Sequence, residues 1–179
     1  MPGEQEARRD LVLALVRNVP DYPSPGILFK DITPVLADAQ ALRAAVDGLN
    51  ALLDGVEPDV VAGVEARGFL LGAPMALAAG TGFVPVRKAG KLPGPTRSVS
   101  YALEYGRAEI EIHADAFTSG QRVVVVDDVL ATGGTAAASC ELLEAGGARV
   151  VAVVFLLELG FLAGRERLGG YDVRSLAVV

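Results

Sequence analysis

The stretch from residue 123 to residue 135, VVVVDDVLATGGT, decides the fold of this chain. Its four consecutive valines predict a strand over 122–127 that is buried on both faces of a sheet. Two carboxylates, Asp127 and Asp128, come at the end of that strand, and a loop of small and hydroxylated residues follows. A helix is predicted over 135–145, with two glycines as its stop. Strand, loop and helix in this order are typical of a parallel sheet covered by helices.

The same alternation continues on both sides of this stretch. Short apolar runs predict strands over 59–64, 83–86 and 150–157, and a helix-like pattern occupies 68–79. Strands that alternate with helices indicate an α/β fold with a mainly parallel sheet. Ligands in such sheets bind beyond the carboxyl ends of the strands, so we look for the chemistry there.

The N-terminal part follows a helical period. Apolar residues recur at helical spacing over 7–19 and again over 38–53, where Asp38 is the expected N-cap. The proline-rich segment 20–26 between them is predicted to lack regular structure, because proline fixes φ and removes a backbone donor.

An antiparallel arm interrupts the alternation. The Gly- and Pro-rich segment 89–98 leads into two strands, expected over 98–105 and 108–113, with a turn at Gly106-Arg107. On the alternating pattern, Ile110 and Ile112 face inward, whereas Glu109, Glu111 and His113 face water.

Composition and charge exclude several classes of protein. The chain has 179 residues, 51% of them hydrophobic and 21% charged, and a net charge of −6, which opposes general binding to nucleic acid. The longest apolar run, 150–157, is too short to cross a membrane, and the N-terminus is polar and acidic. The single cysteine, Cys140, is expected to pack inertly and fits a reducing, cytoplasmic location. A local anion site remains open, because Arg87, Lys88, Lys91 and Arg97 gather on one segment.

The loop after the valine strand suits a ribose 5-phosphate. Gly133 and Gly134 allow backbone N–H groups to converge on a phosphate, and Thr132 and Thr135 add hydroxyl donors near a helix N-terminus. The two aspartates can accept hydrogen bonds from vicinal ribose hydroxyls. One aspartate or one glycine pair alone would indicate only a capped turn, but the combined order favours the phosphate site. The loop matches neither a Walker A motif nor a dinucleotide fingerprint.

This loop resembles the phosphoribosyl-pyrophosphate motif of type I phosphoribosyltransferases. Four more segments resemble the adenine phosphoribosyltransferases among them: 21–34 their hood, 65–69 their pyrophosphate loop, 86–93 the start of their catalytic loop, and 103–106, Leu-Glu-Tyr-Gly, its end. The resemblance extends from about residue 11 to residue 176. It implies a single domain over 1–179 with a twisted, mainly parallel sheet flanked by helices. It also implies a hood over about 1–37, and a flexible antiparallel arm within a mobile catalytic loop over about 87–108.

The resemblance also implies the reaction. The phosphoribosyl group of phosphoribosyl pyrophosphate (PRPP) would pass to adenine, giving AMP and pyrophosphate in purine salvage. Mg²⁺ would be the cofactor, held through pyrophosphate and ribose oxygens without a direct protein ligand. A homodimer is expected, with no nucleic-acid or membrane partner. Two alternatives stay open: transfer to another base such as hypoxanthine, guanine or xanthine, and a non-catalytic PRPP-binding regulator, for which an acidic domain without a basic face is poorly suited.

The implied site residues fall into groups by the part of the substrate that they meet. Glu104 holds or donates a proton at the imidazole edge of the purine, and Tyr105 packs over the site. Lys30 stands where many relatives carry Arg, and only Arg offers a planar fork. Taken singly, each cation is more typical of a solvated surface, and it is their placement at strand ends and on the Gly- and Pro-rich loop that favours a functional role. The remaining assignments are Ala66, Arg67, Arg87, Lys88 and Lys91 to pyrophosphate; Asp127 and Asp128 to ribose; Ala131, Thr132, Gly133, Gly134 and Thr135 to the 5′-phosphate; and Leu28, Phe29 and Lys30 to adenine.

Overall fold

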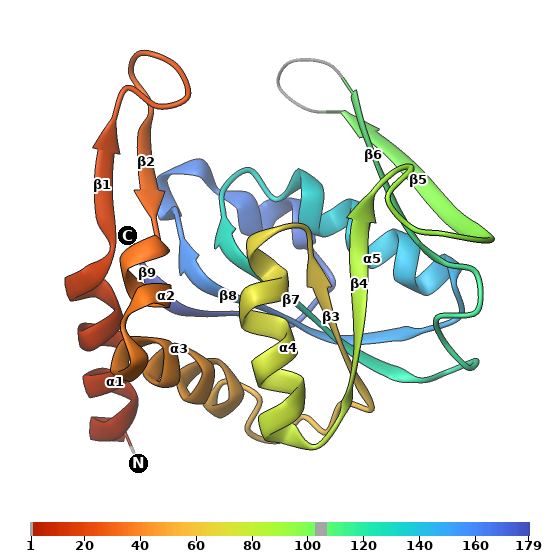
Figure 1. Cartoon of the computed structure of the whole chain (residues 1–179), viewed down its shortest axis with the longest axis horizontal. Helices are drawn as coiled ribbons and strands as arrows, with labels where there is room; N and C mark the ends of the chain where they lie inside the picture. The colour runs from red at the N-terminus through yellow and green to blue at the C-terminus, as the bar shows by residue number, and fades with distance from the viewer. Residues whose placement is uncertain (1, 103–106) are drawn as a thin grey trace.

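A parallel sheet with helices on both faces organises the chain (Figure 1). The computed structural model describes residues 2–102 and 107–179, and over these ranges seven strands form the main sheet and two form a separate hairpin. The elements are α1 (Pro2–Leu15), β1 (Arg17–Pro20), β2 (Leu28–Asp31), α2 (Thr33–Ala37), α3 (Ala39–Ala51), β3 (Val60–Val64), α4 (Arg67–Ala79), β4 (Gly82–Lys88), β5 (Thr96–Ala102), β6 (Arg107–His113), β7 (Arg122–Leu130), α5 (Gly134–Ala145), β8 (Arg149–Glu158), the 3₁₀ turns η1 (Gly160–Leu162) and η2 (Gly164–Leu168), and β9 (Val173–Val178).

The order of strands in the main sheet is β5-β6-β4-β3-β7-β8-β9. Strands β4, β3, β7, β8 and β9 run parallel, whereas β6 and β5 add an antiparallel edge next to β4. This arrangement confirms the predicted α/β fold. Because β3 and β7 are parallel neighbours, the segments that follow them lie side by side at one edge of the sheet.

The valines of β7 are buried on both faces of the sheet, as predicted. Val124 and Val126 belong to a core that includes Leu49 of α3 and Leu71 of α4. Their neighbours Val123 and Val125 belong to the opposite core, which α5 covers. Full burial of a valine side chain stabilises the fold by about 1.5 kcal/mol or more, so this strand is a strong anchor for the loop after it.

The helix predicted over 7–19 was wrong in its last four residues. Helix α1 ends at Leu15, and Arg17–Pro20 form β1, which pairs with β2 in an antiparallel hairpin and includes Pro20, predicted to lack regular structure. The register sets Val19 opposite Phe29. Cross-strand pairing of β-branched and aromatic residues outweighs the weak helical period here. In Figure 1 this hairpin rises from the same side of the molecule as the β5–β6 arm, with the carboxyl ends of β3 and β7 between them.

The antiparallel arm is present, and one of its predicted orientations was wrong. Strands β5 and β6 pair antiparallel, and Ile110 and Ile112 are buried as expected. Glu111, predicted to face water, is only 5% exposed. Its carboxylate accepts hydrogen bonds from the backbone N–H groups of Lys91 and Leu92, both at 2.8 Å, because the loop between β4 and β5 folds over β6. Of the predicted turn at Gly106-Arg107, Arg107 is the first residue of β6, whereas residues 103 to 106 lie outside the described residues.

The other helices follow the sequence closely. Helix α3 begins after Asp38, whose Oδ1 accepts hydrogen bonds from the N–H groups of Gln40 and Ala41. Helix α5 ends before Gly146, as predicted. Cys140 of α5 is fully buried, and burial raises the pKa of its thiol to about 12, in keeping with an inert packing role. Within the described ranges, no helix is long and apolar enough to cross a membrane.

Candidate active site

Arg67 connects three parts of the molecule at the carboxyl edge of the sheet. As the first residue of α4, it follows directly on the loop after β3. Its Nε lies 2.8 Å from Oδ2 of Asp128, and its guanidinium carbon lies 5.0 Å from the ring centroid of Phe29. Residues that the sequence assigned separately to pyrophosphate, ribose and adenine are therefore in contact through one side chain.

The two aspartates lie within β7 and not at its end, because the strand continues to Leu130. Successive strand residues point to opposite faces. Asp128 accordingly faces α4 and Arg67. Asp127 instead lines the cavity in front of residues 131–135, the phosphate loop. The backbone N–H of Asp128 donates to Oδ1 of Asp127 at 2.9 Å, which fixes the first carboxylate.

The pKa values of the two aspartates are shifted by their surroundings in a way that favours a hydrogen-bond donor or a cation beside them. Burial raises the pKa of Asp127 well above its ordinary value, and the nearby charge of Asp128 raises it further. Burial also raises the pKa of Asp128, although the guanidinium of Arg67 opposes that rise. Hydroxyl donors or a cation beside these two carboxyl groups would therefore stabilise their ionised form.

The phosphate loop surrounds a small cavity. It has a volume of about 90 Å³ and lies at the N-terminus of α5, where unpaired backbone N–H groups and the helix dipole favour an anion. Gly133 has a φ of +79° and is the N-cap of that helix. The structure brings all five predicted phosphate-loop residues to this cavity, whose lining comprises Asp127, Val129, Leu130, Ala131, Thr132, Gly133, Gly134, Thr135, Ala136 and Phe155.

Two contacts to the phosphate loop were missed by the sequence analysis. The turn η2 packs against the loop so closely that a Cβ at Gly133 would lie 2.4 Å from the carbonyl oxygen of Gly164. From the arm, the phenol oxygen of Tyr101 lies 3.1 Å from Oγ1 of Thr135. Both partners are distant from the loop in sequence and carry no motif, so only the tertiary structure reveals them.

The basic segment 87–91, at the end of β4 and just after it, is organised by Glu65, a residue of the predicted pyrophosphate loop to which the sequence analysis gave no role of its own. Oε2 of Glu65 lies 3.3 Å from Nε of Arg87 and accepts a hydrogen bond from the backbone N–H of Lys88 at 2.9 Å. Arg87 also donates to the carbonyl oxygen of Lys91. The side chains of Lys88 and Lys91 are exposed. Arg87 is thus tied to the loop that contains Ala66, while the two lysines extend from the same segment.

The residues predicted to bind adenine lie on the hood hairpin. The ring of Phe29 packs edge-on against Tyr22, with centroids 5.1 Å apart, and Leu28 is 47% exposed. Nζ of Lys30 donates to Oδ1 of Asn18 across the hairpin, a contact within the hood itself. The predicted catalytic residues Glu104 and Tyr105 lie outside the described residues.

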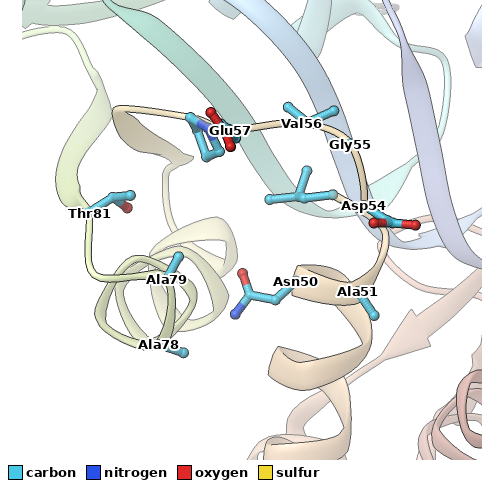
Figure 2. Close-up of a pocket in the computed structure, with 11 residues that line it drawn as sticks. Asn50, Ala51, Asp54, Gly55, Val56, Glu57, Ala78, Ala79 and Thr81 are labelled. Carbon is cyan, nitrogen blue, oxygen red and sulfur yellow. The ribbon is translucent and has the colours of Figure 1, made fainter. Parts of the chain in front are cut away.

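A larger hollow lies at the opposite edge of the sheet. Figure 2 shows it between the C-terminal ends of α3 and α4 and the loop before β3, with Asn50 directed into it. Its volume is about 680 Å³, yet none of the predicted site residues lines it. The predicted site residues gather at the other edge, so the size of this hollow alone does not make it the candidate site.

The sequence and the fold match those of known proteins. The family described as phosphoribosyl transferase domain matches residues 30–176. An adenine phosphoribosyltransferase of Thermobifida fusca is 56% identical over 169 residues, covering 94% of this chain and 96% of that protein. The crystal structure of an adenine phosphoribosyltransferase from Thermoanaerobacter pseudethanolicus superposes with a TM-score of 0.93 at 53% identity, covering 96% of this chain and 99% of that one.

A third relative was crystallised with ligands. The adenine phosphoribosyltransferase of Saccharomyces cerevisiae, in complex with adenine and D-2,5-dideoxy-2,5-imino-altritol 1,6-bisphosphate, superposes with a TM-score of 0.90 at 40% identity. The alignment covers 96% of this chain and 99% of the yeast chain. The chain therefore belongs to the adenine phosphoribosyltransferase family, and it is an enzyme that transfers the phosphoribosyl group of PRPP to adenine, giving AMP and pyrophosphate in purine salvage.

Proposed function

We propose that PRPP lies across the carboxyl edge of the sheet, from the phosphate loop to Arg67. The observation that carries this proposal is the simultaneous contact of Arg67 with Asp128 and Phe29. In this arrangement the 5′-phosphate occupies the cavity of residues 131–135, and the ribose hydroxyls donate to Asp127 and Asp128. The pyrophosphate lies next to Ala66 and Arg67, with Arg87, Lys88 and Lys91 supplying positive charge from the neighbouring segment.

Adenine then binds between this edge and the hood. We assign stacking on the base to Phe29, and recognition of its Watson–Crick edge to backbone groups near Leu28. The yeast relative, solved with adenine and a bisphosphate together, supports a site in which base and phosphates are close neighbours. Lys30, which bonds to Asn18, contributes by holding the two strands of the hairpin in register.

The transfer step needs positioned charge more than covalent chemistry. Loss of pyrophosphate from the anomeric carbon leaves an oxocarbenium-like ribosyl centre, which N9 of adenine attacks. Arg67 and the basic segment stabilise the charge that gathers on the leaving group. Glu104 holds or donates the proton at the imidazole edge, and Tyr105 packs over the site as part of the loop. Closure of the segment 87–108 over the site would exclude water and prevent hydrolysis of the activated ribosyl group.

A divalent cation fits the charge of this site. Asp127 and Asp128 place two adjacent carboxyl groups at the site, and Arg67 supplies one positive charge in contact with Asp128. A cation would favour the ionised form of both carboxyl groups, which suits Mg²⁺ held through the pyrophosphate and ribose oxygens of the substrate, where it would neutralise the departing pyrophosphate. Over the described residues, no group of three or more His, Cys, Asp and Glu side chains is arranged to hold a metal by itself.

The quaternary state and location are also proposals. A homodimer agrees with Leu70 and Leu77, two exposed leucines on the outer side of α4, and size-exclusion chromatography with light scattering tests it directly. The acidic charge and the single buried cysteine favour a cytoplasmic protein without a nucleic-acid partner.

A panel of bases tests the assignment of the hood. The purified protein, PRPP and Mg²⁺ are incubated with adenine, hypoxanthine, guanine, xanthine, uracil or orotate, and the nucleotide product is quantified. We expect AMP from adenine and little product from the other bases. Comparable turnover of a second base would overturn the role given to Phe29 and Leu28 while leaving the phosphate loop in place.

A further inference from the structure

Tyr101 connects the arm to the phosphate loop. It lies on β5, where it pairs with Ala108 of β6, and its ring packs partly buried against the core beneath α5. Its phenol oxygen lies 3.1 Å from Oγ1 of Thr135, in the first turn of that helix. The two residues are far apart in sequence, and neither the loop motif nor the arm pattern predicts their contact.

The hydroxyl of Thr135 can donate one hydrogen bond, and the direction of its O–H bond decides how well the site binds a phosphate. A hydroxyl donates once and accepts up to twice, and a phosphate dianion only accepts. Charge-assisted hydrogen bonds are the stronger kind, so the hydroxyl of Thr135 donates its hydrogen bond to a bound phosphate. The phenol of Tyr101 then has to donate its own proton to Oγ1, and in doing so it holds the threonine hydroxyl directed at the ligand.

We propose that Tyr101 is a positioning residue of the 5′-phosphate site. Its phenol donates a hydrogen bond to Thr135 and so directs the threonine hydroxyl toward the phosphate. This inference rests on the proposed placement of the 5′-phosphate in the loop 131–135. Tyr101 belongs to the arm and not to the loop, so the phosphate subsite is built from two separate segments of chain. The same contact joins 5′-phosphate binding to the strand that precedes residues 103–106.

A double-mutant cycle tests the contact, with ribose 5-phosphate as the ligand. Its dissociation constant is measured by calorimetry for the wild type, Tyr101→Phe, Thr135→Val and the double variant. Phenylalanine preserves the ring packing of Tyr101 and removes only the hydroxyl. Tyr171→Phe is the matched control, because its phenol donates to Glu144 on the surface, away from the loop.

We expect Tyr101→Phe to raise the dissociation constant about 3- to 10-fold, the effect of losing one hydrogen bond. Thr135→Val should raise it at least as much, and Tyr101→Phe should add less than about 2-fold in the Thr135→Val background, because the shared contact is already lost. The control should bind as the wild type does. With PRPP and adenine, the KM for PRPP should rise in Tyr101→Phe, and the KM for adenine should stay within about 2-fold.

Each other outcome has a definite meaning. An unchanged affinity in Tyr101→Phe, with weakened binding in Thr135→Val, overturns the role of Tyr101 and leaves the phosphate site standing. Fully additive effects also overturn it, because they show that the tyrosine hydroxyl acts independently of Thr135. Undiminished binding in both single variants would remove the 5′-phosphate from this loop, and with it the proposed placement of PRPP.

Discussion

Arg67 and Asp128 form an ion pair across the junction of α4 and β7 in which only the carboxylate is deeply buried. The side chain of Asp128 is 4% exposed, whereas that of Arg67 is 36% exposed. A guanidinium has five N–H donors, and the contact described here engages the edge at Nε. The rest of the fork is available to an anionic ligand, so one residue can neutralise a buried aspartate and still bind pyrophosphate.

Replacement of Arg67 should therefore weaken PRPP binding. We expect Arg67→Ala to raise the dissociation constant of PRPP by about 10- to 100-fold, the effect of losing a charge-assisted hydrogen bond. Calorimetric titration measures this directly, and Arg67→Lys should recover part of the affinity. Arg43→Ala, an exposed change on α3, is the control. Unchanged affinity in Arg67→Ala would contradict the pyrophosphate assignment.

Gly133 should tolerate no side chain. Its φ of +79° disfavours an L-residue, and a Cβ there would meet the carbonyl oxygen of Gly164 at 2.4 Å. Gly133→Ala should lower the free energy of unfolding by about 2–4 kcal/mol and abolish measurable binding of ribose 5-phosphate. Gly55→Ala separates the two causes: Gly55 has a φ of +77° with nothing within 4 Å, so it should lose only about 1–2 kcal/mol. Equal losses in both variants would show that η2 yields to the added methyl group.

The pH dependence of PRPP binding should follow Asp127. Its raised pKa means that it takes up a proton at a higher pH than an ordinary aspartate, and an ionised carboxylate accepts hydrogen bonds from ribose hydroxyls more strongly than a protonated one. We expect PRPP affinity to fall as the pH is lowered from about 8 to about 5, with proton release on binding.

The stability of the unliganded protein should respond to Asp127 in the opposite sense. Its folded state holds this proton more tightly than the unfolded state, so the contribution of Asp127 to stability increases as the pH falls through the raised pKa toward the ordinary one. Asp127→Asn should flatten both profiles when calorimetry and thermal unfolding are repeated across this range. A wild-type profile in that variant would assign the titration to another group.

Turnover should depend on Glu104. Because Glu104 is proposed to hold or donate the proton at the imidazole edge of adenine, Glu104→Gln should lower kcat by about 10²- to 10⁴-fold, with a smaller change in the KM values. Glu109→Gln is the matched control, because Glu109 is an exposed carboxylate of the same arm that accepts a hydrogen bond from Ser98. Turnover near the wild-type rate in Glu104→Gln would withdraw the catalytic assignment.

The sequence predicted those parts of the fold that depend on local patterns. The valines of β7 and the glycines after them determine their surroundings through burial, φ and helix capping, and all of these act over a few residues. The same holds for Asp38, which caps α3 as expected.

Other features depend on partners that are distant in sequence. Val19 is part of a strand because Phe29 lies opposite it, and Glu111 is buried because a loop folds over it to supply two N–H donors. The pairing of Arg67 with Asp128, and of Tyr101 with Thr135, likewise arises only when separate elements meet. The residue types of a site can be read from its motifs, but its connections require the tertiary structure.

The packing of η2 on the phosphate loop extends the recognisable motif into a second part of the chain. A Cβ at Gly164 would lie 2.2 Å from the carbonyl oxygen of Ala131, just as one at Gly133 would meet Gly164. Backbone lies against backbone at both glycines, and neither position leaves room for a methyl group. A saturation-mutagenesis map of this enzyme should therefore show two separate bands of intolerance, one at the loop and one at η2, and natural variation at either glycine should be purged as strictly as variation at the other.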